Sequence, residues 1–357
     1  MSKDAWVGGP HRHFSWLLAL CLLSLLALAP GTAAAAPPAS PEANPAAVAP
    51  IRFPQDEAPH TLESEWWYYT GHLVTPDGRH FGFEEVFFHG HQGLASGYAA
   101  NFAITDDARH SFAYAQRRTG TKGVAQPAAG FDLTIGDWSL RGANGHDAIA
   151  ASMPGYAISL SLTATTPPVL QGGTGYISYG ATGGSYYYSR PRMTVAGTLT
   201  VDGETEPVTG EAWMDHQWGD FSVFRLGGWS WYSVQLDDGT DLMLYLVRDT
   251  AQRAVLTAGT LIAPDGAVSV LGAGDFAVSP KATWTSPHTG RTYAAEWRIA
   301  LPHQGITLTL TPTVADQEVD SRRTTGVVYW EGEVTVQGTS GGRPAAGRGY
   351  VELVGET

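Results

Sequence analysis

The chain has 357 residues, of which 43% are hydrophobic, and a formal net charge of −13 at pH 7. An acidic protein of this kind repels phosphate groups, so we expect neither nucleic acid nor an anionic membrane surface as a partner. Cys21 is the single cysteine, so the sequence offers no disulfide.

The first 36 residues have the pattern of a secretory signal peptide. Arg12 precedes an apolar run over residues 16–29, and small residues follow at 32–36. We therefore expect a secreted or periplasmic protein with no integral membrane span after cleavage, and an uncleaved anchor is the alternative. Residues 37–55 are rich in proline and alanine, which is typical of a linker.

From residue 56 onward the sequence predicts antiparallel β-structure. Apolar and polar residues alternate in segments such as 157–163 and 306–311, which places one set of side chains on a buried face. Asp-Gly pairs between such runs are typical of tight hairpins, and they occur at 77–78, 202–203, 238–239 and 265–266. The many short strands predict an all-β fold.

The second half of the chain repeats the first. Aromatic and apolar residues recur at one constant offset: Trp66, Tyr68 and Leu73 align with Trp229, Trp231 and Leu236. Further blocks follow in the same order, and the last aligns residues 197–203 with 332–338. We predict two tandem β-barrel domains, over residues 56–225 and 226–357, each of an ordinary domain size.

Charged residues surround the first aromatic segment. Glu63 and Glu65 precede it, and Glu84 and Glu85 lie on the next predicted strand. Carboxylates in such positions are usually edge or solubilising residues, and a buried acid is the alternative. His89 and His91 share a strand face, but no third ligand is visible, so we predict no metal site.

The segment GEAWMDHQWGDF, residues 210–221, is the strongest candidate for chemistry. On a strand, Trp213 and Asp215 project from one face, and His216 and Trp218 project from the other. Indole rings around an aspartate disfavour its charged form, so its pKa rises and it can serve as a general acid. The alternative is structural: Asp215 anchors the strand through hydrogen bonds and His216 lies at the surface.

The predicted catalytic residues are Asp215, His216 and Trp213. The predicted ligand-binding residues are aromatic side chains of both domains, which suit an apolar ligand: Trp66, Tyr68, Tyr186, Tyr188, Trp218, Trp229 and Trp231. In the second domain, Glu352 aligns with Asp215, but the histidine and the second tryptophan are missing. We therefore expect Glu352 to titrate as an ordinary surface carboxylate. We also expect one cavity, formed mainly by the first domain and roofed by the second at the interface between them.

Several segments resemble one protein family. They include ESEWWYYTGHL, SYYYSRPRM, VTGEAWMDHQWG and GWSWYSVQLDDGTDLMLYLVR, and the similarity extends over residues 55–355. The sequence is similar to the family that joins AttH-type proteins with the carotenoid hydratases, also called hydroxyneurosporene synthases. This resemblance implies two tandem lipocalin-like antiparallel β-barrel domains.

The resemblance also implies an activity. The family's characterised hydratases add water to a terminal alkene of an acyclic carotenoid without a cofactor, and their proton-donating aspartate falls on Asp215 with Trp213 as its aromatic partner. The resemblance thus implies a hydro-lyase that acts on a small hydrophobic substrate, an isoprenoid or other apolar alkene, with no cofactor. One alternative is a non-catalytic protein that binds lipid or isoprenoid in the cell envelope. Another is a secreted hydrolase, for which the sequence shows no nucleophile with a base.

Overall fold

The computed structural model describes residues 48–92, 95–121, 124–125 and 127–356. The predicted signal peptide, residues 1–36, and residues 37–47 of the predicted linker lie outside the described residues. The described residues belong to one unit, which extends over 42–357. Within them, no helix is long and apolar enough to cross a membrane.

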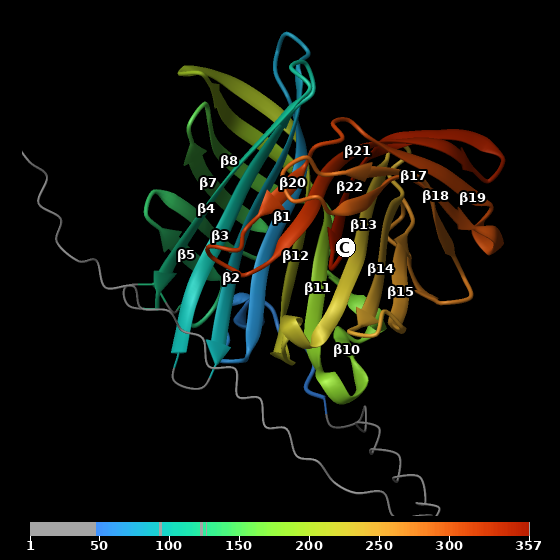
Figure 1. The fold of residues 1–357 in the computed structure, drawn as a ribbon, viewed down its shortest axis with the longest axis horizontal. Coiled ribbons are helices and arrows are strands. Elements are labelled where there is room, and N and C mark those ends of the chain that lie inside the picture. Colours follow the sequence, from blue (N-terminus) through green and yellow to red (C-terminus); the bar gives the residue numbers. More distant parts are fainter. Residues whose placement is uncertain (1–47, 93–94, 122–123, 126, 357) are drawn as a thin grey trace, which may run out of the picture. The chain divides into compact units, whose positions relative to one another are not determined.

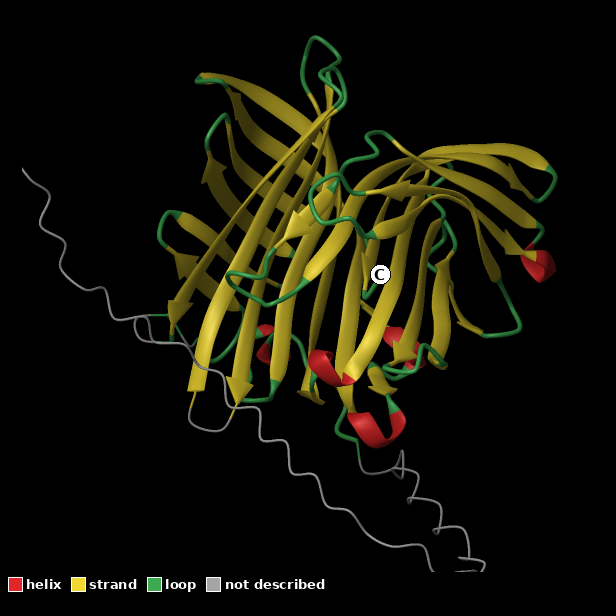
Figure 2. Cartoon of the chain, in the orientation of Figure 1, coloured by secondary structure: helices red, strands yellow, loops and turns green. Residues whose placement is uncertain are grey.

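The fold is all-β, as predicted, and its helices are single 3₁₀ turns (Figure 2). The strands of the first sheet are β1 (Ser64–Val74), β2 (His80–Gln92), β3 (Ala95–Asp106), β4 (Ser111–Gly120), β5 (Phe131–Ile135), β6 (Trp138–Ala143), β7 (His146–Met153), β8 (Tyr156–Ala164), β9 (Val169–Leu170), β10 (Tyr176–Ser178), β11 (Gly183–Val201) and β12 (Glu204–Phe221). The strands of the second sheet are β13 (Leu226–Leu236), β14 (Asp241–Asp249), β15 (Ala254–Ile262), β16 (Val268–Gly272), β17 (Ala277–Thr285), β18 (Thr292–Leu301), β19 (Ile306–Pro312), β20 (Glu318–Asp320), β21 (Val328–Ser340) and β22 (Arg343–Val354). The 3₁₀ turns are η2 (Gln55–Glu57), η3 (Gln171–Gly173), η4 (Gly180–Thr182), η5 (Val223–Arg225) and η6 (Pro302–Gln304).

The two sheets repeat one strand order. The first runs β4-β3-β2-β1-β12-β11-β8-β7-β6-β5, and the second runs β16-β15-β14-β13-β22-β21-β19-β18-β17 (Figure 1). The register repeats as well, because Leu73 pairs with Gly210 in the first sheet and Leu236 pairs with Gly347 in the second. The predicted duplication is therefore confirmed, and each copy is a curled antiparallel sheet that forms a barrel-like domain.

Glycine is required at the same place in both copies. A Cβ atom at Gly210 would lie 1.8 Å from the carbonyl oxygen of His72, and one at Gly347 would lie 2.2 Å from that of Gln235. Atoms cannot approach so closely, so only glycine lets these strands pair in this way. The shared requirement supports the alignment of β12 with β22.

In the described part of the chain, three large apolar clusters hold the fold together, beside a small fourth cluster of Val319, Tyr329 and Val354. One fills the first sheet around Trp67 and Tyr69, and one fills the second sheet around Trp297 and Trp330. A third lies between the sheets, and its buried aromatic members are Tyr68, Tyr179, Tyr187, Trp213, Phe221, Trp231, Tyr245 and Tyr350. Strand alternation explains why neighbours such as Trp67 and Tyr68 enter different clusters. Each central strand is therefore covered on both faces.

The end of the predicted linker packs against the first domain. Ile51 and Phe53 contact the first core, and the ring centroid of Phe53 lies 4.9 Å from that of Tyr188. Glu57 in η2 forms a buried ion pair with Arg190 of β11. Residues 51–57 therefore contribute to this domain.

Candidate functional site

A cavity of about 520 Å³ lies between the two sheets and is the candidate functional site. Side chains of β1, β2, β11 and β12 line it from the first sheet, and side chains of β13, β14, β21 and β22 line it from the second. Most of the lining residues belong to the first domain and the rest to the second, so the cavity agrees with the expectation of a site formed mainly by the first domain. The second domain contributes because the outer faces of the two sheets pack against each other.

Asp215 of β12 lies in the wall of this cavity and is 2% exposed. Its carboxylate accepts hydrogen bonds from Trp213 Nε1 at 2.8 Å, from Tyr187 Oη at 2.6 Å and from Ser189 Oγ. Burial raises the pKa of Asp215 to about 6, although these three hydrogen bonds favour the charged form and oppose the rise. In the described part of the chain, no basic side chain contributes to this pKa shift.

The donors to Asp215 are themselves held by hydrogen bonds that reach the second sheet. Trp231 Nε1 of β13 donates to Tyr187 Oη at 3.1 Å. Ser189 Oγ accepts from Gln171 Nε2 at 2.7 Å, and Gln171 Oε1 accepts from Thr260 Oγ1 of β15 at 2.6 Å. These supporting contacts fix the geometry around Asp215 in advance, which a reacting group requires.

Glu352 of β22 lines the same cavity. It accepts a hydrogen bond from Trp229 Nε1 at 2.9 Å. Burial raises the pKa of Glu352 to about 7; the Trp229 hydrogen bond opposes this rise, and the charge of Asp215 adds to it. The expectation that Glu352 titrates as an ordinary surface carboxylate is wrong, because the first sheet covers its face of β22.

Two further acids lie beside Asp215 and Glu352. Glu84 of β2 accepts from Tyr329 Oη at 2.8 Å, and Glu331 of β21 accepts from Tyr68 Oη at 2.8 Å. Burial raises the pKa of Glu84 to about 8 and raises that of Glu331 well above its usual range. The interface between the sheets therefore concentrates carboxyl groups whose pKa values lie above their ordinary range.

Three of the four acids predicted to be edge residues are buried, and Glu63 is half-buried. Glu65, Glu84 and Glu85 are each 1% exposed or less. Glu84 faces the second sheet, whereas Glu65 lies against His216, which is fully buried on the opposite face of β12 from Asp215. The interpretation of these buried acids as solubilising residues is therefore wrong. Segments from elsewhere in the chain cover both faces of β1 and β2.

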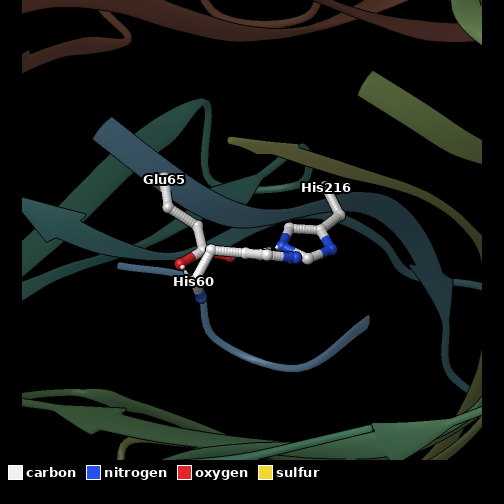
Figure 3. A group of neighbouring side chains, drawn as sticks. All are labelled: His60, Glu65 and His216. Atoms are coloured by element: carbon white, nitrogen blue, oxygen red, sulfur yellow. Dashed lines mark hydrogen bonds and ion pairs between the residues drawn. The ribbon is translucent and has the colours of Figure 1, made fainter. Parts of the chain in front are cut away.

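His216 joins Glu65 and His60 in a compact group (Figure 3). Glu65 Oε1 lies 2.9 Å from His216 Nε2 and 2.7 Å from His60 Nδ1. Burial alone would raise the pKa of Glu65, but hydrogen bonds with His216, His60 and His89 hold it at about 2. Burial lowers the pKa of His216 to about 4. At neutral pH this face therefore holds a carboxylate anion and a neutral imidazole.

The donor atoms of His60, Glu65 and His216 lie within 4.8 Å of one another, so this group has the spacing to hold a metal ion. Both oxygens of Glu65 already have protein partners, because Oε2 accepts the backbone N–H of His60 at 2.8 Å. The contacts among the three residues thus form a hydrogen-bonded network that fixes the segment before β1 against β12.

The structure divides the predicted site residues between two faces of the first sheet. Trp66, Tyr68, Trp229 and Trp231 line the cavity together with Asp215, and Trp213 supports Asp215 as a donor. Tyr186, Tyr188 and Trp218 do not reach the cavity and lie with His216. Trp218 stacks on His60 with ring centroids 4.4 Å apart.

A β-bulge explains why Tyr187 enters the site in place of Tyr186 and Tyr188. The hairpin register that starts at Val201 and Glu204 would place Tyr188 opposite Gln217. A register shift between Arg190 and Met193 places Tyr187 there instead. One inserted residue moves every later side chain to the other face of the strand. Pro191, which lies within the shift and has no N–H to pair, is the sequence signal for it.

The fold and the cavity together define a class of protein: a duplicated β-barrel whose two domains enclose a cavity with buried carboxyl groups. The AttH-like family matches residues 44–356. The chain belongs to the AttH-like family.

Three known proteins show how the chain relates to others. A solved structure described as AttH, from Nitrosomonas europaea, is 31% identical with a TM-score of 0.77, covering 87% of this chain and 98% of the other. Kievitone hydratase of Nectria haematococca shares the fold at 18% identity and a TM-score of 0.70, covering 87% of this chain and 94% of the other. Dehydratase asqC of Emericella nidulans is 26% identical over 218 residues, which are 58% of this chain and 60% of the dehydratase.

Proposed function

We propose that the protein is a hydro-lyase that adds water to, or removes water from, a carbon–carbon double bond of an apolar ligand. The observation that carries this proposal is Asp215, a buried carboxyl at the wall of an aromatic cavity whose pKa shift involves no basic side chain in the described residues. The similarity to a hydratase and to a dehydratase supports the same class of reaction.

In the proposed reaction Asp215 is the general acid. Its pKa of about 6 leaves roughly one molecule in ten protonated at pH 7. The proton forms a new C–H bond with one alkene carbon, and the other carbon becomes a cation. Water then adds to this cation, and its released proton returns to a carboxylate. In the dehydration direction the same steps run in reverse.

The aromatic lining suits both the ligand and the cation. Trp66, Trp229 and Trp231 line the cavity beside Asp215, and their rings can pack against an apolar chain. The face of an indole also attracts a positive charge, so these rings would stabilise a carbocation without capturing it. We therefore propose an isoprenoid or another apolar alkene or alcohol as the substrate.

Binding without reaction is the competing function, because an apolar cavity could equally carry a lipid. The position of Asp215 favours a reaction, since burying a carboxyl without a basic partner costs free energy that a pure carrier would not need to spend. We also propose that the protein acts outside the cytoplasm, on the basis of the signal pattern in residues 1–36. Sequencing the amino terminus of the protein recovered from cells tests the export.

Isotope incorporation tests the reaction. The purified protein is incubated in H₂¹⁸O with geranylacetone, which has trisubstituted alkenes, and separately with linalool, a tertiary alcohol that can lose water. We expect ¹⁸O in an alcohol product or the formation of a triene. Asp215→Asn should lower the rate by about 10²-fold or more, because the amide keeps the shape and loses the proton.

The exposed Asp220, on the same strand, provides the matched control. Asp220→Asn should retain the full rate. If Asp215→Asn retains it too, or if the wild type converts neither compound, the proposal is wrong. A loss of more than about 2 kcal/mol of stability in Asp215→Asn would instead indicate a structural role.

A further inference from the structure

The duplication places two carboxyls at equivalent positions on either side of one cavity. Asp215 pairs with Tyr68 across β12 and β1, and Glu352 pairs with Trp231 across β22 and β13. Tyr68 and Trp231 are equivalent residues of the two copies, so Asp215 and Glu352 are equivalent as well. Both carboxyls line the cavity, so the ligand would meet one acid from each half of the chain.

Hydrogen bonds connect the surroundings of the two acids. Trp231 lies directly opposite Glu352 in the sheet, and its Nε1–H donates to Tyr187 Oη at 3.1 Å. Tyr187 in turn donates to Asp215 at 2.6 Å. The two carboxyls also interact electrostatically, since the negative charge of Asp215 raises the pKa of Glu352. The positions of the two carboxyls are therefore fixed relative to each other.

The groups around the pair disfavour a second negative charge. The titratable side chains of the cluster between the sheets and of the adjoining strands are acids and phenols: Tyr68, Glu84, Tyr179, Tyr187, Tyr245, Tyr329, Glu331 and Tyr350. Among the described residues that line the cavity, Arg118 and His89 are basic. Arg118 lies exposed on β4, and His89 Nδ1 lies 3.5 Å from Glu65. Two carboxylates that face one apolar cavity repel each other, so such a pair tends to retain one proton.

We propose that Asp215 and Glu352 form a catalytic pair, one residue from each half of the duplication, which holds a single proton when the substrate binds. This inference rests on the proposed hydro-lyase function. The protonated member donates its proton to the alkene carbon, and the ionised member accepts the proton that water releases as its oxygen bonds to the neighbouring carbon. The pair thus ends with one proton, and exchange with solvent returns it to the starting carboxyl. The reaction needs no oxidant, reductant or further reactant.

Titration of Glu352 tests the pair without any substrate. The side-chain carboxyl groups are labelled with ¹³C, and the Glu352 resonance, assigned through Glu352→Gln, is followed against pH by NMR. In Asp215→Asn the midpoint of Glu352 should fall by about one pH unit, because its negative neighbour is gone. Glu204→Gln removes an exposed acid from the same strand as Asp215 and should not move the midpoint. An unchanged midpoint in Asp215→Asn overturns the pair.

Rates with linalool and geranylacetone test the catalytic role. The wild type should have a bell-shaped pH–rate profile, and Glu352→Gln should lower the rate by about 10²-fold and remove one limb of the bell. Glu352→Asp, which keeps a carboxyl, should recover part of the rate. Such a recovery would show that the loss in Glu352→Gln does not come from a folding defect. If Glu352→Gln keeps the full rate and both limbs while Asp215→Asn is inactive, the pair is overturned and the proposed function stands. If Asp215→Asn is active as well, the proposed function itself is wrong.

Discussion

Asp215 and Glu65 are both buried carboxyls beside β12, yet they lie on opposite faces of the first sheet and hold protons very differently. Burial raises the pKa of Asp215 to about 6, whereas hydrogen bonds from histidines hold that of Glu65 at about 2 despite burial. The partners make the difference, because the hydroxyl and indole donors of Asp215 offset burial only in part. We therefore assign the proposed proton transfer to the cavity between the sheets and a structural role to the opposite face of the first sheet.

Removing the charge of Glu65 should give the largest effect on stability. Glu65→Gln leaves His60 and His216 without their anionic acceptor and should lower the free energy of unfolding by about 3 kcal/mol. Urea denaturation measures this loss. The matched variant is Asp215→Asn, whose loss should be smaller by at least about 1 kcal/mol, because the neutral amide suits a site that already disfavours charge. Equal losses would show that both carboxyls are structural.

The sequence predicts which residues share a face but not what covers that face. Alternation along the strand places Asp215 and His216 on opposite faces, and the structure confirms this separation. The burial of Glu65 and Glu84 depends on His216 and on Tyr329, which lie far away in the sequence. Contacts of this kind depend on how the sheets curl and pack, so a local sequence pattern cannot predict them.

Substitutions of two predicted ligand-binding residues should distinguish the cavity face of the first sheet from its opposite face. Trp66 and Tyr186 are both half-buried, but Trp66 lines the cavity and Tyr186 stacks on Trp218. Trp66→Ala should weaken binding of the apolar dye Nile red about tenfold, an effect of about 1.4 kcal/mol. Tyr186→Ala should leave the affinity within about twofold. Fluorescence titration measures both, and equal weakening would place the ligand elsewhere.

The choice between Tyr186, Tyr187 and Tyr188 shows where sequence reasoning fails within a strand. Three consecutive tyrosines fit either face, so only the register decides which of them reach the ligand. The register changes at the bulge next to Pro191, and Tyr187 becomes the donor to Asp215. By contrast, Trp66, Tyr68, Trp229 and Trp231 lie on stretches of β1 and β13 in which the register does not shift, and the structure places all of them at the cavity.

A smaller effect should appear in the pH dependence of stability. The pKa of Glu352 rises from 4.5 to about 7 on folding, so between pH 6 and 8 the folded protein binds a proton that the unfolded chain does not. Stability should therefore fall as the pH rises through this window, by about 1 kcal/mol from this group. Glu84 adds a loss in the same direction, since its pKa rises to about 8.

Denaturation at pH 6 and at pH 8 measures this dependence. Glu352→Gln should flatten the pH dependence, because its side chain cannot titrate, whereas the exposed-residue variant Glu204→Gln should keep it. Stability that rises from pH 6 to pH 8 would contradict the inferred protonation of the cavity, since groups with a raised pKa lose their contribution as the pH increases.

The most direct test compares the two carboxyls in one experiment. A ¹³C NMR titration of the labelled wild-type protein should show Asp215 with a midpoint near 6, while Glu65 remains ionised throughout the range in which Asp215 titrates. That result would establish a proton-holding acid in the cavity and a permanent anion on the opposite face of the sheet. A midpoint for Asp215 near its ordinary value of about 4, or one shared with Glu65, would contradict the account.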